Sequence, residues 1–303
     1  MSLDSGNIPA DWKRANVSPK YKKSNKSSAD NYRPISLTSQ ICKLFESLLR
    51  DKVVEHLEKY LLIDNSQHGF RKKRSCVTNL LVFLDKITRS LEEGNNIDVV
   101  FLDMVKAFDK VPHERLLRKV EACGIGGKVL RWIRAWLTGR QQRVCLHGSS
   151  SGWRNVTSGV PQGSVLGPVL FLIYINDLGE NIYNTLLMFA DDTKMFGKVN
   201  DFVDALKFQM DLSKLVNWSY KWHMKFNTSK CSIMHVGRKN VGQSYYIGEK
   251  QLSSVNFQKD LGVWISDDMK VSHQCSQACK SANRVLGMMN RTISYKNPSI
   301  MLA

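Results

Sequence analysis

The sequence predicts an α+β fold in which a split β-α-β-β-α-β unit follows a mostly helical N-terminal region. Between residues 99 and 236, short apolar runs alternate with helical patterns in the order strand, helix, hairpin, helix, strand. This is the order of elements in ferredoxin-like folds. Before residue 95, apolar residues instead recur at spacings of three and four over two long segments, which is typical of helices.

The two N-terminal helices are expected over residues 41–62 and 77–91. The second ends where Gly94 introduces a turn. A polar loop with the sequence IDNSQHGFRKKRS joins them, and the preceding residues 13–34 are basic and rich in turn formers. We therefore treat residues 1–95 as one subregion that packs beside the β-α-β-β-α-β unit.

The elements of that unit follow from their apolar patterns. Residues 99–102 form a continuous apolar run, as expected for a central strand buried on both faces, and Asp103 ends it. The stretch 112–140 predicts two short inserted helices. The remaining elements are a buried helix at 164–178, a hairpin at 185–199, an amphipathic helix at 202–222 with Asp201 as its N-cap, and a strand at 232–236.

Two adjacent acids, Asp191 and Asp192, occupy the turn of the predicted hairpin. Asn-Gly or Asp-Gly would suit a turn that serves folding alone, whereas neighbouring carboxylates raise each other's cost of ionisation. In this sheet order the first strand lies beside the hairpin, so Asp103 should face both acids. Three converging carboxylates are stable around divalent cations. The alternative is a solvated turn, with Asp103 as a strand-end cap.

Composition favours a polyanionic partner. The 44 Lys and Arg residues outnumber the 27 Asp and Glu residues, which gives a net charge of +17 and favours nucleic acid before membrane. A merely soluble basic protein is the alternative. The seven cysteines form no C-x-x-C pair, and the longest apolar run, at 165–175, is too short to span a bilayer. We therefore expect an intracellular chain from a reducing compartment, without a signal peptide or membrane span.

Five motifs in colinear order closely resemble the reverse transcriptases of non-LTR (LINE-type) retrotransposons, especially the jockey-like group. They are NYRPISLT, HGFRKKRSC, VFLDMVKAFDKVPH, SGVPQGSVLGPVLF and FADD. The resemblance runs from about Asn7 to the end of the chain and implies a right-hand polymerase fold. Its expected parts are fingers at 1–95 with a basic N-terminal segment, a palm at 96–245 with the helical insertion 112–140, a primer-grip-like hairpin at 246–271, and the start of a truncated thumb at 272–303.

The resemblance also implies roles for the acidic residues. Asp103, the main-chain carbonyl of Met104 and Asp191 would bind two Mg²⁺ ions, with Mn²⁺ as a possible substitute, and Asp192 would be a weaker ligand. Two such ions support phosphoryl transfer. Lys230 would protonate the pyrophosphate leaving group; a solvent-facing lysine at a strand start is the alternative.

Further matched positions imply substrate contacts. Arg71 would grip the triphosphate, Phe108 would exclude a 2′-hydroxyl, and Gln162 with Gly163 would contact the incoming nucleotide and the template. From the residues alone, alternatives remain for two of these. Phe108 fits a core aromatic, and the cationic run that begins at Arg71 fits a solvated loop or a nuclear-import patch. Gly159 and Gly163 are expected to bend a backbone close to a ligand, and His68 and His113 receive no role.

The function that the resemblance implies is an RNA-directed DNA polymerase. Its partners would be an RNA template, a DNA primer or target and dNTPs, in a ribonucleoprotein found in the nucleus and cytoplasm. Met104-Val105 departs from the aromatic-small pair that is usual in the family. Because an endonuclease and a full thumb are not recognisable, the sequence is expected to be a fragment or a decayed copy. The alternative is a catalytically silent, truncated nucleic-acid-binding remnant.

Overall fold

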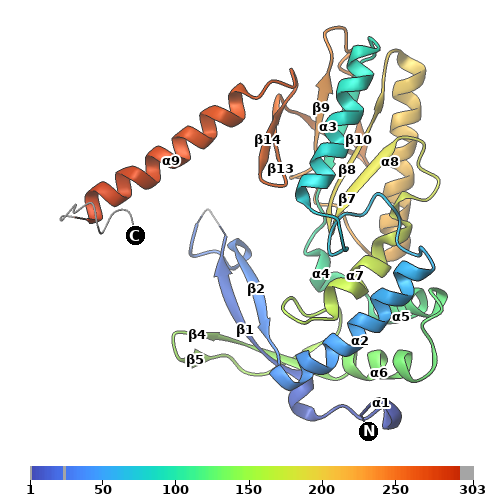
Figure 1. Ribbon diagram of the computed structural model, residues 1–303, viewed down its shortest axis with the longest axis vertical. Helices are drawn as coiled ribbons and strands as arrows, with labels where there is room; N and C mark the ends of the chain where they lie inside the picture. The colour runs from blue at the N-terminus through green and yellow to red at the C-terminus, as the bar shows by residue number, and fades with distance from the viewer. Residues whose placement is uncertain (1, 23–24, 294–303) are drawn as a thin grey trace.

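The computed structural model describes residues 2–22 and 25–293, and Figure 1 shows two β-sheets at opposite ends of an elongated molecule. The central sheet has the strand order β12-β9-β3-β8-β7. Its strands are β3 (Ile97–Leu102), β7 (Thr185–Phe189), β8 (Asp192–Lys198), β9 (Ser232–Val236) and β12 (Ser253–Ser254). Strand β3 is antiparallel to both of its neighbours, β8 and β9. The predicted β-α-β-β-α-β unit is therefore confirmed, with β12 as an added edge strand.

Two helices complete this unit as the sequence predicts. Helix α7 (Gly167–Ile175) continues into the short helix η3 (Asn176–Gly179), and α8 spans Phe202–Trp222. The side chain of Asp201 accepts a hydrogen bond from the Asp204 amide at 2.8 Å, which confirms the predicted N-cap.

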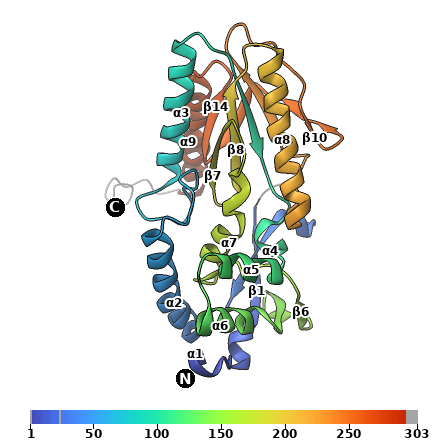
Figure 2. The same ribbon diagram turned by 90° about the vertical axis from the view of Figure 1, so that its right-hand side faces the viewer.

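The alternation of side chains along β3 gives the central sheet two apolar faces. Val100 and Leu102 point into the core formed with α7 and α8. Val99 and Phe101 point the other way, into a cluster that includes Phe83 of α3. Successive side chains of a strand point to opposite faces, so a strand that is apolar throughout needs cover on both sides. Figure 2 shows α3 and α8 on opposite sides of the sheet.

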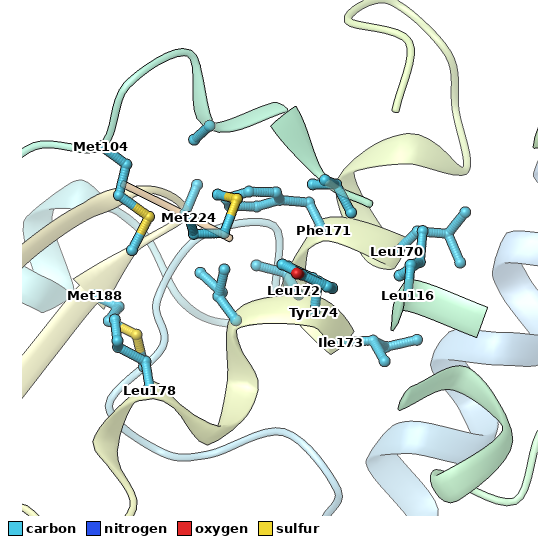
Figure 3. Close-up of a cluster of buried hydrophobic side chains, with 14 of the residues drawn as sticks. Met104, Leu116, Leu170, Phe171, Leu172, Ile173, Tyr174, Leu178, Met188 and Met224 are labelled. Atoms are coloured by element: carbon cyan, nitrogen blue, oxygen red, sulfur yellow. The ribbon is translucent and has the colours of Figure 1, made fainter. Parts of the chain in front are cut away.

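The core around α7 lies beneath the ends of β3 and β7, where the predicted acidic residues are. Figure 3 shows the side chains of Met104, Met188 and Met224 grouped at one side of the α7 cluster. All three are buried. Met104 directly follows Asp103, Met188 lies in β7 before the acidic turn, and Met224 lies in the connection that follows α8. Packing here therefore fixes the backbone from which the acidic side chains project.

The N-terminal region contains the two predicted helices, α2 (Gln40–Lys59) and α3 (Cys76–Glu92). Ser75 caps α3 through a reciprocal pair of hydrogen bonds with Thr78. Helix α3 lies on the central sheet, whereas α2 lies lower, beside the inserted helices (Figure 1).

A second sheet adds strands to the mostly helical N-terminal region that the sequence predicts. It is formed by β1 (Arg14–Tyr21), β2 (Tyr32–Leu37), β4 (Arg140–Leu146), β5 (Ser149–Ser150) and β6 (Arg154–Val156). Strand β4 pairs in parallel with β1, so residues 140–156, which the sequence placed with the palm, join the N-terminal strands instead. Only Ala15 and Val17 of β1 are buried, and so short an alternation was not recognisable as a strand.

The other elements are short or peripheral. They are α1 (Ser2–Ser5), η1 (Ala10–Lys13), η2 (Ala29–Asn31), α4 (Ala107–Lys110), α5 (His113–Ala122), α6 (Gly127–Leu137), the hairpins β10 (Tyr246–Ile247) with β11 (Lys250–Gln251) and β13 (Phe257–Asp260) with β14 (Val263–Ser266), and α9 (Ser272–Thr292). Helix α9 has no buried residue and projects away from the central sheet (Figure 1). The last ten residues of the expected thumb segment, 294–303, lie outside the described residues. No helix in the described part is long and apolar enough to cross a membrane.

Candidate active site

The three predicted carboxylates lie at the same end of two adjacent strands. Asp103 follows β3, while Asp191 and Asp192 lie at the turn from β7 to β8. Leu102 is paired with Thr193 across the sheet, which places the acids side by side as the sequence predicted. Burial raises the pKa of Asp191, and the Asp103 charge raises it further. Burial, followed by the charges of Asp191, Asp260 and Asp103, raises the pKa of Asp192 to about 6.

This acidic cluster is not a complete metal cage. Among the described residues, no group of three or more His, Cys, Asp or Glu side chains is arranged to hold a metal ion. Mg²⁺, however, is usually bound by one or two carboxylates together with substrate phosphates and water. Asp103 and Asp191 supply two carboxylates whose mutual repulsion a cation would relieve. The residues present therefore fit Mg²⁺ that is bound together with a nucleotide.

The backbone next to Asp103 is held in place by an antiparallel bridge between Met104 and Phe226. Its two hydrogen bonds run from the Asn227 amide to the Asp103 carbonyl at 2.7 Å and from the Val105 amide to the Lys225 carbonyl at 2.9 Å. The Met104 carbonyl takes part in neither bond. It remains suited to the ligand role predicted for it.

Lys230 lies beside the first carboxylate. Its Nζ atom is 3.3 Å from Oδ2 of Asp103, and the two side chains are 61% and 33% exposed. The lysine belongs to the turn that precedes β9, the strand paired with β3. Lys230 is thus solvent-exposed, as one alternative held, and also directed at Asp103.

Gln67 is a site residue that the sequence reasoning missed. Its Oε1 atom accepts hydrogen bonds from the amides of Gly69 at 2.7 Å and Ala190 at 2.9 Å, and its Nε2 atom donates to the Ala190 carbonyl at 3.4 Å. Ala190 precedes the acidic pair and has a left-handed backbone with φ of 55°, which is costly for a residue with a Cβ. The buried Gln67 side chain thus holds the turn in this conformation. A polar residue next to the H-G-F motif was the only sequence signal.

Replacing Gln67 with leucine should lower kcat and destabilise the protein by about 2 kcal/mol, because two buried amides lose their acceptor. Gln209 is a matched control, since it holds the backbone of Tyr246 through the same pair of hydrogen bonds at 2.9 and 3.0 Å. Gln209→Leu should leave kcat unchanged. Steady-state primer extension with urea unfolding measures both effects. Equal kcat values in the two variants would exclude a positioning role for Gln67.

The two histidines without a predicted role have structural partners. His68 Nε2 accepts a hydrogen bond from Arg74 at 3.0 Å, and its Nδ1 lies 2.9 Å from the Thr78 hydroxyl. Burial, and then the Arg74 charge, lowers the pKa of His68 to about 4. His113 Nε2 lies 2.8 Å from the Gly159 carbonyl. Both histidines thus have positioned partners, and these contacts are structural.

Arg71 is turned toward its own loop. Its Nη1 atom donates to the Asp64 carbonyl at 2.7 Å and to the Gln67 carbonyl at 3.5 Å, and burial lowers its pKa. These bonds brace the loop that carries Gln67. A contact between Arg71 and a triphosphate stays a prediction.

Phe108 lies between the core and the active-site side of the palm. Its ring stacks on Phe171 of α7 with centroids 4.2 Å apart and approaches the edge of Phe70 at 6.4 Å. The residue is half-buried. It therefore packs against the core, as the alternative held, without being fully buried.

The glycines of the Gln162 loop are required by the protein backbone. A Cβ on Gly163, whose φ is 120°, would lie 2.5 Å from the Ser36 carbonyl oxygen, and one on Gly159, whose φ is 87°, would lie 2.7 Å from the Asp109 backbone. This close approach to neighbouring backbone is by itself a structural reason for both glycines. A nucleotide contact by Gly163 stays a prediction.

Gln162 is fixed by the same packing. Its carbonyl accepts a hydrogen bond from the Ser36 amide at 2.7 Å, and its side-chain Nε2 donates to Oδ1 of Asp109 at 3.2 Å. Burial raises the pKa of Asp109. The loop thus joins the first catalytic motif to strand β2 of the second sheet.

The model of the family described as reverse transcriptase (RNA-dependent DNA polymerase) matches residues 21–286. This chain belongs to that family. The chain is 30% identical over 265 residues to the probable RNA-directed DNA polymerase from transposon X-element of Drosophila melanogaster, covering 84% of the chain and 29% of that relative. It is 28% identical over 240 residues to the RNA-directed DNA polymerase from mobile element jockey of the same organism, covering 76% of the chain and 26% of that relative. The predicted resemblance to the jockey-like group is confirmed, and the chain spans less than a third of the length of these relatives.

A solved structure supports the fold of this chain. The apo telomerase from Candida tropicalis, truncated from its C-terminal domain, superimposes with a TM-score of 0.59 at 13% identity, covering 86% of this chain and 54% of that one. At this identity the similarity concerns the fold alone. The predicted right-hand polymerase fold is confirmed.

Proposed function

We propose that this reverse transcriptase is an RNA-directed DNA polymerase of a non-LTR retrotransposon, which extends a DNA primer along an RNA template with dNTPs. The observation that carries the proposal is the placement of Asp103 and Asp191 at the ends of adjacent strands. The charge of Asp103 repels that of Asp191 and raises the pKa of Asp191. Carboxylates crowded in this way are stabilised by divalent cations. Reverse transcriptases generally use such ions, and Mg²⁺, with Mn²⁺ as a substitute, is the cofactor proposed here.

In the proposed mechanism, Asp103, Asp191 and the Met104 carbonyl hold the cations, and Asp192 contributes more weakly. When bound, Mg²⁺ would make the attacking 3′-hydroxyl more acidic and would stabilise the charge that develops on the phosphate oxygens. Lys230 stands 3.3 Å from Asp103 and is exposed enough to reach the leaving pyrophosphate and donate a proton to it.

The remaining residues position the substrates. Arg71 binds the triphosphate, Gln162 contacts the incoming nucleotide and its templating base, and Phe108 closes the space beneath the sugar. The hairpin of β13 and β14 holds the primer end, and α9 begins the thumb. We further propose that the protein acts in a ribonucleoprotein in the cytoplasm and nucleus.

Primer extension tests the proposed function. Wild-type protein should extend oligo(dT) on poly(rA) in the presence of Mg²⁺, and EDTA should stop the reaction. The predicted site residues are all present, and no observation favours the catalytically silent alternative. RNA binding without extension in either Mg²⁺ or Mn²⁺ would establish that alternative instead.

Replacing Phe108 with alanine should admit ribonucleotides, because the ring would no longer fill the space beneath the 2′ position. An enzyme that excludes a wrong substrate by a steric clash loses that selectivity when the clashing group is removed. The measurement is the ratio of kcat/KM for dGTP and rGTP, which should fall by about tenfold or more in the variant. Phe171→Leu, which removes the ring beneath Phe108, is the packing control. An unchanged ratio in Phe108→Ala would identify Phe108 as a core aromatic only.

A further inference from the structure

A buried carboxylate of α2 binds the backbone of the loop that carries Gln162. Glu46 is fully buried, and its Oε2 atom accepts hydrogen bonds from the amides of Val165 at 2.7 Å and Leu166 at 3.1 Å. These two residues lie where the loop enters α7. The mechanism proposed above gives Glu46 no role.

The start of α7 depends on Glu46 because it has no side-chain cap of its own. Leu166 occupies the N-cap position, and its apolar side chain makes no capping hydrogen bond. Amides at the start of a helix have no acceptor within the helix and carry partial positive charge. Glu46 supplies both an acceptor and a negative charge, from a position 119 residues before Val165. Helix α2 therefore fixes the point at which the loop ends.

The other partners of Glu46 hold its carboxylate in place. Its Oε1 atom accepts a hydrogen bond from the Cys42 thiol at 3.2 Å. Burial, and then the charge of Glu46, raises the pKa of Cys42 to about 12, so the thiol keeps the proton that it donates. Burial lowers the pKa of Arg140, and the charge of Glu46 opposes that change. A buried charge is stable only with partners of this kind, and both oxygen atoms of Glu46 have them.

The segment that contains Glu46 also holds the other side of the loop. The Ser36 amide of β2 donates to the Gln162 carbonyl at 2.7 Å, and α2 begins soon after β2 ends. Ser36 thus holds the loop before Gly163, while Glu46 holds it after Gly163 at Val165. The position of Gln162 therefore depends on the β2–α2 segment as well as on the central sheet.

We propose that Glu46 is a positioning residue for nucleotide binding, which holds the loop where Gln162 meets the incoming nucleotide. The proposal rests on the polymerase function and on the Gln162 contact proposed above. Without the carboxylate, two amides lose their acceptor and the loop is held on one side only. A misplacement of about 1 Å can cost about 100-fold in catalysis. Because Asp103 and Asp191 belong to other segments, the loss should appear in the KM for the dNTP rather than in kcat.

Single-nucleotide incorporation by the whole chain, with kcat and KM for the dNTP measured separately, tests the proposal. Glu46→Leu should raise KM by about 10- to 100-fold and change kcat by less than about threefold. A smaller folded fraction would lower the apparent kcat but would leave KM unchanged, so KM reports the position of the loop.

Asp211→Leu is the matched control for the loss of a buried carboxylate. Asp211 of α8 is 1% exposed and accepts hydrogen bonds from the amides of Tyr183 at 2.9 Å and Asn184 at 2.8 Å. These amides lie at the end of β7 away from the acidic turn. Asp211→Leu should lose stability in urea, as Glu46→Leu does, but should keep the wild-type KM.

Two further variants separate the hydrogen bonds of Glu46 from its charge. Glu46→Gln keeps an oxygen that can accept both amide hydrogen bonds, so its KM should stay within about threefold of wild type although the loss of charge makes it less stable. Glu46→Asp keeps the charge but shortens the side chain, so its KM should rise. It provides the same comparison if Glu46→Leu does not fold.

The outcomes distinguish this proposal from the proposed function. A wild-type KM in Glu46→Asp, and in Glu46→Leu where that variant folds, would overturn the positioning role while leaving the polymerase proposal intact. An equal rise of KM in Asp211→Leu would also overturn it. Wild-type protein that extends no primer in Mg²⁺ or Mn²⁺ would instead overturn the polymerase proposal, and this one with it.

Discussion

Replacing Asp103 or Asp191 with asparagine should slow nucleotide incorporation by about 10²- to 10⁴-fold. Stabilisation of the transition state by bound cations is worth several kcal/mol, and about 1.4 kcal/mol corresponds to each tenfold change in rate. Each carboxylate supplies ligands that an amide replaces poorly, because the amide carries no charge. Single-nucleotide incorporation under saturating dNTP and Mg²⁺ is the measurement.

The controls separate lost chemistry from lost structure. Asp85→Asn removes an exposed carboxylate of α3 and should leave the rate unchanged, while Asp192→Asn should have an intermediate effect. In EDTA, Asp191→Asn should be at least as stable as wild type, since burial and the nearby Asp103 charge raise the pKa of Asp191 and its ionised form is disfavoured. Near-normal incorporation by either Asp103→Asn or Asp191→Asn would refute the assignment of the catalytic acids.

Replacing Asp260 with asparagine should destabilise the protein by about 3–5 kcal/mol, because it leaves the charge of Lys194 buried without its ion-pair partner. Lys194 of β8 forms an ion pair with Asp260 of β13, and their side chains are 3% and 10% exposed. The Lys194 ammonium also lies 4.6 Å from the centroid of the Phe83 ring of α3. One buried lysine therefore connects the catalytic hairpin, α3 and the proposed primer-holding hairpin. Urea unfolding measures the loss of stability.

Another ion pair of the same strand provides the matched comparison. Lys198 of β8 pairs with Glu93 at 2.7 Å, but both side chains are more than half exposed, so Glu93→Gln should cost about 0–1 kcal/mol. The double variant Lys194→Met with Asp260→Leu should recover most of the stability lost in Asp260→Asn, since it removes both buried charges. Equal losses of stability in Asp260→Asn and Glu93→Gln would show that burial does not increase the cost of breaking the Lys194–Asp260 pair.

The central sheet was predictable because its signals are local. The apolar run before Asp103 buries all of its side chains and the two strands of the hairpin around Asp191 bury more than half of theirs, and such strands stand out in the sequence. The second sheet was not predictable, because Ala15 and Val17 alone mark the inner side of β1. Its parallel partner, β4, is also remote in sequence, and no local pattern encodes that pairing.

The site shows the same division. The acids were recognisable from their motifs and from the cost of placing Asp191 next to Asp192. The contribution of Gln67 was not, because it depends on hydrogen bonds to a backbone 123 residues away. The sequence indicated that Gly163 must remain a glycine, but it did not identify the neighbour that excludes a side chain, which is the Ser36 carbonyl. The residue type shows that a position is constrained, whereas the tertiary structure shows which neighbouring groups impose the constraint.

The parallel pairing of β1 with β4 affects the order in which the chain can fold. Arg14 lies opposite Gln141, so the first strand emerges from the ribosome roughly 125 residues before its partner, which is about 6–25 s at ordinary rates of synthesis. Until then β1 and β2 form only a two-stranded ribbon, which is marginally stable in water. The N-terminal region therefore should not become a finished folding unit until β4 has been synthesised. It should acquire protection from hydrogen exchange only after β4 has docked, later than the helices of the same region.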